Sequence, residues 1–160
     1  MTDTVTGRDL DARVAEVVFG WQWWAHTKAE RDDPHGPRVE RVVRTLHAPD
    51  FQPGPWEEWA AHTGKVFRPA TGDEPVERVQ GMGDAVRQSL VPPYSSDMSA
   101  AWLVVDEMRR RDWILNLRVG PSGKAEVAFA DDGEERPVAR HVAKSPALAI
   151  CRAALAALAR

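Results

Sequence analysis

The segment Tyr94-Ser95-Ser96-Asp97 is the best candidate for a binding loop in this sequence. Hydroxyl groups beside the unpaired main-chain N–H groups at a helix N-terminus can hold an anion. The same residue types also cap helices, and the Asp97 carboxylate would repel an anion unless it points away. We therefore expect these four residues to form a helix cap, with ligand binding as the alternative.

Tryptophan offers a second kind of chemistry, because its ring can stack on a base, a planar ligand or a partner protein. The chain has seven tryptophans in 160 residues. Four of them fall on predicted strands or on the apolar face of a predicted helix, and we expect these in the core: Trp21, Trp23, Trp113 and Trp102. The remaining three are harder to bury at once: Trp24, Trp56 and Trp59. They either cover one another or form an exposed binding surface.

Groups for catalysis or metal binding are sparse. The single cysteine, Cys151, lies among alanines and leucines, so we expect a buried thiol rather than a nucleophile. The five histidines lack the i, i+4 spacing of a helical metal site: His26, His35, His47, His62 and His141. Gly81-Met82-Gly83-Asp84-Ala85 lacks the third glycine and the Lys-Ser/Thr ending of a phosphate loop. We predict no catalytic residues, no metal and no cofactor.

Three amphipathic helices are expected to position these residues. The first begins near Thr6, with Thr6 and Asp9 at capping-box spacing, and ends at Gly20. Its apolar face is formed by Leu10, Val14, Val17 and Val18, and Asp11, Arg13 and Glu16 fall off that face. The second begins after Ser95–Asp97, with an apolar face formed by Met98, Ala101, Trp102, Val105 and Met108. The third begins with Ser145 as cap and Pro146 at its first position.

Strands are expected between these helices. Residues 21–27 form the first strand, and residues 113–119 form a half-buried strand followed by a Gly-Pro-Ser-Gly turn. Residues 125–130 and 138–142 follow as two more strands. Within the Pro- and Gly-rich segment 28–91, residues 39–46 fit a strand or a short helix, and residues 55–62 fit a helix.

The resulting order is helix, strand, insertion, helix, three strands, helix. Successive hairpins flanked by helices predict an α+β fold, in which an antiparallel sheet of about four strands is packed by three main helices. The length of 160 residues suits one domain, with an ordered insertion at about 28–91.

Composition excludes several classes of protein. Apolar residues make up 43% and charged residues 28%, which is typical of a globular protein. The net charge of −3 gives no basic excess for binding nucleic acid. The sequence has no apolar run of the ~18 residues needed to span a membrane, and its polar first residues lack a signal-peptide pattern. We therefore expect a cytoplasmic protein.

Three ordered motifs resemble the phage ABA sandwich domain family of small phage and prophage proteins. The first is Leu10-Asp11-x-x-Val14-Ala15-Glu16-Val17-x-Phe19-Gly20-Trp21. The second is Pro92-Pro93-Tyr94-Ser95-Ser96-Asp97 followed by Ala100-Ala101-Trp102. The third is Pro146-Ala147-Leu148-Ala149-Ile150-Cys151-Arg152-Ala153-Ala154-Leu155, in which Ala147 departs from the family pattern. Segment 28–91 shows no match to the family motifs. The resemblance implies an α/β sandwich and a mobile-element origin, without an activity.

These observations favour a non-enzymatic binding protein of phage or prophage type. Its partner would be a host protein or a small molecule such as a nucleotide. Two alternatives stay open: a small hydrolase whose site is assembled only in the fold, and a structural or assembly factor that self-associates through apolar surface.

Overall fold

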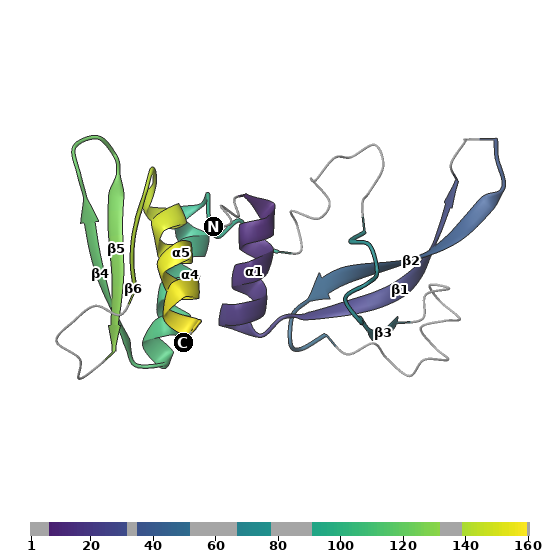
Figure 1. The fold of residues 1–160 in the computed structure, drawn as a ribbon, viewed down its shortest axis with the longest axis horizontal. Coiled ribbons are helices and arrows are strands. Elements are labelled where there is room, and N and C mark those ends of the chain that lie inside the picture. The colour runs from purple at the N-terminus through teal and green to yellow at the C-terminus, as the bar shows by residue number, and fades with distance from the viewer. Residues whose placement is uncertain (1–6, 32–34, 52–66, 78–90, 132–138, 160) are drawn as a thin grey trace. The chain divides into compact units, whose positions relative to one another are not determined.

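The chain forms an α+β structure, as predicted. The computed structural model describes residues 7–31, 35–51, 67–77, 91–131 and 139–159 (Figure 1). These residues contain three helices and six strands, and the strands form two antiparallel sheets of three rather than one sheet of about four. The difference arises because the segment predicted as an insertion contributes strands of its own.

The chain is divided into two compact units. Unit 1 comprises Met1–Gly20 and Val91–Arg160, and unit 2 comprises Trp21–Leu90. The elements of unit 1 are α1 (Arg8–Phe19), α4 (Met98–Arg110), β4 (Trp113–Val119), β5 (Ala125–Asp131), β6 (Ala139–Ala143) and α5 (Pro146–Leu158). The elements of unit 2 are β1 (Gln22–Arg31), β2 (Arg38–His47) and β3 (Phe67–Pro69).

Helix α5 forms the centre of unit 1. It begins as predicted, with Pro146 in its first turn and Ser145 Oγ accepting a hydrogen bond from the Leu148 N–H at 3.4 Å. One side contacts β5 and β6, and other sides contact α1 and α4 (Figure 1). Its buried residues surround most of the helix: Ala147, Leu148, Ala149, Ile150, Cys151, Ala153, Ala154 and Ala157. Because most of these are alanine, neighbouring elements can approach closely on several sides.

Helix α4 packs by a face different from the predicted one. Asp97 is its N-cap and accepts a hydrogen bond from the Ala100 N–H at 2.8 Å, as the sequence suggested. The main buried stripe is Ala101, Val104, Val105 and Met108, at i, i+3, i+4 and i+7. Successive helical residues are separated by about 100° around the axis, so Trp102 falls beside this stripe. Trp102 is 45% exposed, and the prediction that it belongs to the core is wrong.

Helix α1 also departs from the expected pattern at its start. It begins at Arg8, and its N-cap is Gly7, which provides no side-chain cap. The predicted capping box is therefore not the start of this helix, and Thr6 lies outside the described residues. Gly20 takes the left-handed conformation at φ 70° and ends the helix as predicted. Asp11 falls off the predicted apolar stripe, but it is only 1% exposed.

The β4–β5 hairpin follows the predicted alternation. Leu115 and Leu117 face the helices and are half-buried, whereas Asn116 and Arg118 are exposed. In the turn, the Gly123 N–H donates to the Gly120 carbonyl at 3.0 Å, and Gly123 has φ 77°. This positive φ explains the need for glycine at that position.

Unit 2 is built on β1, which pairs antiparallel with β2 on one side and β3 on the other. The first predicted strand, residues 21–27, corresponds to β1, and residues 39–46 form a strand rather than a helix. Residues after β3 run from the β1 edge to the far side of β2, where Arg44 bridges to Val76. This connection crosses the sheet, since β1 lies between β2 and β3.

Candidate functional site

The loop before α4 is held by a buried carboxylate from α1. The Ser95 N–H donates to Asp11 Oδ1 at 2.7 Å, and both residues are buried. Arg8 pairs with the other Asp11 oxygen at 3.2 Å and donates to the Val91 carbonyl at 2.7 Å. These contacts join segments 80 or more residues apart in the sequence. Asp11 therefore anchors the loop to α1.

Tyr94 is part of the same anchor. Its ring stacks on Phe19, with centroids 5.0 Å apart and an interplanar angle of 13°. Burial, and then the neighbouring Cys151 and Asp11, raise the pKa of Tyr94 to about 12. The phenol therefore stays protonated at neutral pH.

Three of the four candidate residues in this loop serve the fold. Tyr94 and Ser95 are buried, and Asp97 caps α4. The Ser95 hydroxyl also donates to the Gly7 carbonyl at 3.4 Å. Ser96 is exposed. Ligand binding at Tyr94, Ser95, Ser96 and Asp97 stays a prediction, and it would have to use Ser96 and the outer edge of Asp97.

Cys151 faces the inside of unit 1. It is fully buried, and desolvation followed by the charge of Asp11 raises its pKa to about 12. Only the thiolate is an effective nucleophile, so this cysteine is inert at neutral pH in the folded protein.

A cluster of rings covers one face of the unit 2 sheet. We call it the aromatic face, and its members are Trp24, His26, His47, Phe51 and Phe67. Trp24 and His26 lie on the same side of β1, and Phe67 is directly opposite His26 on β3. Phe51 stacks on His47 at 3.8 Å and meets the edge of Trp24 at 5.9 Å. Phe67 contacts Phe51 at 5.4 Å and His26 at 5.0 Å, which closes the cluster.

Polar groups lie within and beside this face. His26 is buried, and its Nε2 is 3.4 Å from Glu77 Oε2. The Thr45 hydroxyl is 2.7 Å from Nε2 of His47. Three members of the face are half-buried and remain partly accessible to solvent: Trp24, His47 and Phe51. The arrangement combines stacking surface with groups that can donate or accept hydrogen bonds.

Trp23 lies on the opposite face of the same sheet. Its ring is 4.9 Å from the Arg44 guanidinium carbon, a cation–π contact. The adjacent tryptophans Trp23 and Trp24 of β1 therefore lie on opposite faces of the sheet, so substitution of Trp23 can serve as the control for substitution of Trp24.

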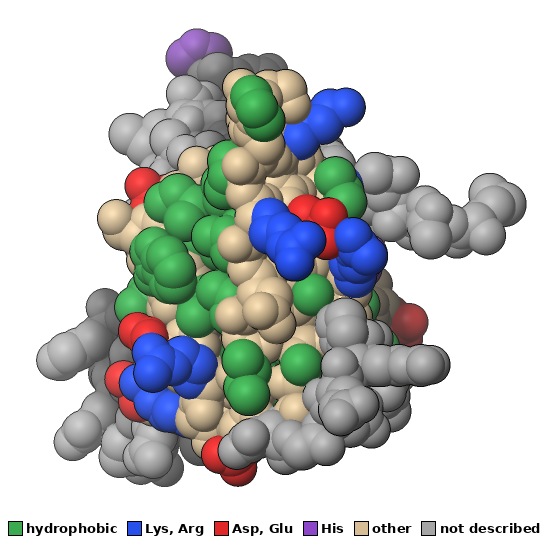
Figure 2. Space-filling view, turned by 90° about the vertical axis from the view of Figure 1, so that its left-hand side faces the viewer, with side chains coloured by type: hydrophobic (Ala, Val, Ile, Leu, Met, Phe, Trp, Pro, Cys, Tyr) green, Lys and Arg blue, Asp and Glu red, His purple; other side chains and the backbone are tan. Residues whose placement is uncertain are grey.

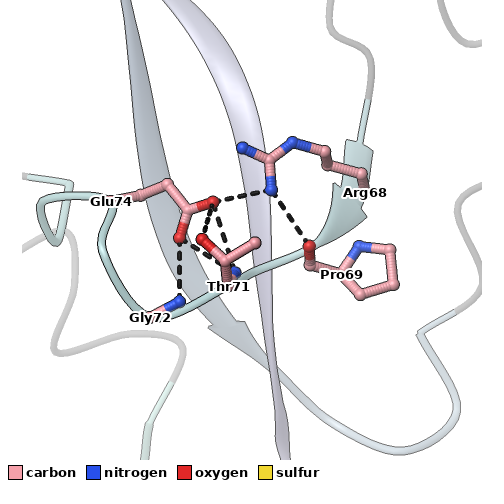
Figure 3. Close-up of polar contacts among 5 residues, drawn as sticks. All are labelled: Arg68, Pro69, Thr71, Gly72 and Glu74. Carbon is pink, nitrogen blue, oxygen red and sulfur yellow. Dashed lines mark hydrogen bonds and ion pairs between the residues drawn. The ribbon is translucent and has the colours of Figure 1, made fainter.

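A buried glutamate organises the connection that crosses unit 2 (Figure 3). Glu74 accepts hydrogen bonds from the Thr71 N–H at 3.0 Å and the Gly72 N–H at 3.1 Å, and pairs with Arg68 at 2.6 Å. Burial acts to raise its pKa, but these main-chain and side-chain donors outweigh it and lower the pKa to about 2. Its carboxylate oxygens are engaged within the turn, so we interpret Glu74 as structural.

The other predicted candidates are dispersed. His141 is half-buried on β6, and desolvation, followed by the charge of Arg152, lowers its pKa. Within the described ranges, no three His, Cys, Asp or Glu side chains converge as a metal site would require. Several candidates lie outside the described residues: Trp56, Trp59, His62 and the glycine-containing run 81–85.

Sequence reasoning missed most of the aromatic face. Only Trp24 was singled out, because His47 and Phe67 join it through strand pairing and Phe51 follows in the turn after β2. That pairing could not be deduced while residues 39–46 fitted either a strand or a helix. Asp11 was missed because it falls off the apolar stripe and its partner, the Ser95 N–H, is distant in the sequence.

Comparison with known families decides the relationship. A model of the phage ABA sandwich domain matches residues 12–155, which is nearly the whole chain. The chain belongs to the phage ABA sandwich family. No curated protein and no solved structure gives a significant match. None of the helices in the described parts of this phage ABA sandwich protein is long and apolar enough to cross a membrane.

The three motifs that resemble the phage ABA sandwich pattern meet inside unit 1. Asp11 belongs to the first, Tyr94 and Ser95 to the second, and Cys151 to the third. The hydrogen bond from Ser95 joins the first two, and the third lies on α5, which contacts α1. In this chain, these motif residues are therefore buried and contact one another within unit 1.

Proposed function

We propose that this phage ABA sandwich protein is a non-enzymatic binding protein, and that the aromatic face of unit 2 contacts its ligand. The observation that carries the proposal is the half-exposed group formed by Trp24, His47 and Phe51. Aromatic rings beside hydrogen-bonding groups suit a flat ring that stacks while its edge is recognised. The favoured ligand is a small molecule such as a nucleotide, and a host protein is the second choice.

The chemistry of unit 1 supports binding over catalysis. Cys151 and Tyr94 are buried, and their raised pKa values keep both protonated at neutral pH. Asp11 and Asp97 are engaged by main-chain N–H groups. The motif residues therefore supply no activated nucleophile.

Adjacent tryptophans allow a controlled test. A panel of nucleotides is screened by thermal shift against wild type, Trp24→Ala and Trp23→Ala. We expect a bound nucleotide to raise the Tm of wild type and of Trp23→Ala. Removal of one stacking ring should weaken binding by roughly 1–3 kcal/mol, so Trp24→Ala should lose most of the shift.

The same variants test the host-protein form of the proposal. A host protein recovered on immobilised wild type should also be retained by Trp23→Ala and lost with Trp24→Ala. If no nucleotide and no host protein binds, or if both variants bind as wild type does, the aromatic face is not the ligand site.

The 2.7 Å contact between Thr45 and His47 favours a small hydrolase as the second candidate function. A hydroxyl hydrogen-bonded to an imidazole has the geometry of a nucleophile and its base. Hydrolysis of p-nitrophenyl esters by wild type, abolished in Thr45→Val, would support this activity. Equal rates for the two proteins would reject it.

A further inference from the structure

Among the described residues of unit 1, the sheet has an unpaired edge at β4. The strand order is β4-β5-β6, and no other described strand pairs with the outer side of β4. On the side facing the helices, Val127 and Phe129 of β5 are fully buried, whereas Leu115 and Leu117 of β4 are only half-buried. Val119, at the end of β4, is 56% exposed.

The opposite face of the sheet is also partly apolar. Ile114 of β4 is 48% exposed there, beside the polar residues Asn116 and Arg118. Figure 2 views the molecule from this side and shows exposed hydrophobic side chains beside groups of Lys and Arg. Edge strands that stay single usually carry a proline, a bulge or an inward-pointing charge, and β4 has no proline and no inward-pointing charge.

The hairpin geometry shows which main-chain groups of β4 face the open side. The Gly120 N–H donates to the Lys124 carbonyl at 2.9 Å, which fixes the hydrogen-bonded positions of the β4–β5 pair. Alternate residues of an antiparallel strand bond to the same neighbour. Ile114, Asn116 and Arg118 therefore bond to β5. The N–H and C=O groups directed to the open side belong to Trp113, Leu115, Leu117 and Val119.

We propose that β4 is a self-association edge, where a second copy of this chain adds its own β4 antiparallel about a two-fold axis at Asn116. In this register Leu115 lies opposite Leu117, and both present main-chain groups to the open side, so they form a hydrogen-bonded pair. Trp113 lies opposite Val119 in the same way. Two three-stranded sheets then become one sheet of six strands.

Charge disfavours the neighbouring register centred on Arg118. Ile114 of one copy lies opposite Arg118 of the other, and the amide of Asn116 meets its own symmetry mate. A register centred on Arg118 would place two guanidinium groups face to face, which is unfavourable. The Asn116 register opposes no like charges and covers the exposed parts of Trp113 and Val119. The proposed dimer involves unit 1 alone and is independent of ligand binding at the aromatic face.

The first test exploits the pairing of Ile114 with Arg118. Light scattering after size exclusion should give wild type twice the 17.8 kDa of one chain at about 100 µM. In the dimer of Ile114→Arg, each new arginine faces Arg118 of the other copy, which gives two pairs of like charge. Ile114→Glu instead gives two pairs of unlike charge at the same positions. The dissociation constants of these variants should differ by about ten-fold, with Ile114→Glu tighter. Within one chain, residues 114 and 118 are four strand residues apart, so the monomer does not favour one sign over the other.

The second test locates the two-fold axis of the dimer at residue 116. Asn116→Asp and Asn116→Lys should each weaken the dimer, and an equimolar mixture should restore it as a heterodimer. Val142→Asp, on the exposed face of the opposite edge strand β6, is the control and should leave the mass unchanged. A monomeric wild type would overturn the proposal. So would a dimer that ignores the substitutions at 114 and 116, or one that Val142→Asp breaks.

Discussion

The carboxylate of Asp11 lies on α1 at the border of the apolar stripe, one polar group beside Val18. It is buried because the loop before α4 needs an acceptor for the Ser95 N–H, and Arg8 balances its charge. A hydrophobic pattern locates the side of a helix that meets other apolar side chains. It does not locate a polar residue whose partner is a main-chain group more than 80 positions away.

We expect Asp11→Ala to lower the free energy of unfolding by about 3 kcal/mol, because it leaves a buried donor without an acceptor and Arg8 without its partner. Asp11→Asn keeps an oxygen for the Ser95 N–H and should cost less. Asp9→Ala, an exposed carboxylate in the same turn, is the control and should cost below about 1 kcal/mol. Urea unfolding measures all three. Equal losses for Asp9→Ala and Asp11→Ala would show that the anchor contributes nothing.

At the scale of elements, local chemistry made several predictions succeed. Ser145 with Pro146, Asp97 at a helix start, and Gly20 at a helix end are each determined by adjacent main-chain groups. The β4–β5 hairpin follows in the same way from its turn. The face of α4 could not be decided so locally, because two overlapping apolar stripes fit the sequence and packing against α5 selects one of them. The aromatic face depends in addition on strand register, which no local pattern gives.

The corrected face of α4 makes a quantitative prediction. Trp102→Ala should change the free energy of unfolding by less than about 1 kcal/mol, since nearly half of the side chain is already exposed. Met108→Ala, in the buried stripe of the same helix, should cost about 2–5 kcal/mol. Denaturant unfolding separates these values well. A larger loss for Trp102→Ala than for Met108→Ala would restore the original assignment.

At the scale of the whole molecule, the chain was predicted as one domain with an insertion at about 28–91. The structure divides into two compact units, with the second spanning Trp21–Leu90. Strand β1 begins among residues predicted to belong to the main sheet and continues into the predicted insertion. Whether both units unfold as a single domain stays a prediction that excision can test.

We expect unit 1 to fold without unit 2. The anchors of α1 all lie within unit 1: Asp11 with Ser95, Phe19 with Tyr94, and the Val18 carbonyl with Arg111. A ten-residue Gly/Ser linker in place of Trp21–Leu90 reaches about 33 Å, longer than the roughly 18 Å of α1. Circular dichroism should show helix and a cooperative thermal transition. A chain without such a transition would show that unit 1 requires unit 2.

The discontinuity of unit 1 has a consequence during synthesis on the ribosome. Helix α1 leaves the ribosome early, but its partners α4 and α5 follow the whole of unit 2, and α5 ends at Leu158. The intervening stretch of about 140 residues takes roughly 7–30 s to translate. Until α4 has been made, the apolar stripe of Leu10, Val14 and Val18 has neither of its helix partners, and α5 follows later still, while residues 21–90 are already complete. Unit 2 can therefore mature first, and the earliest helix to be made is among the last to find its place.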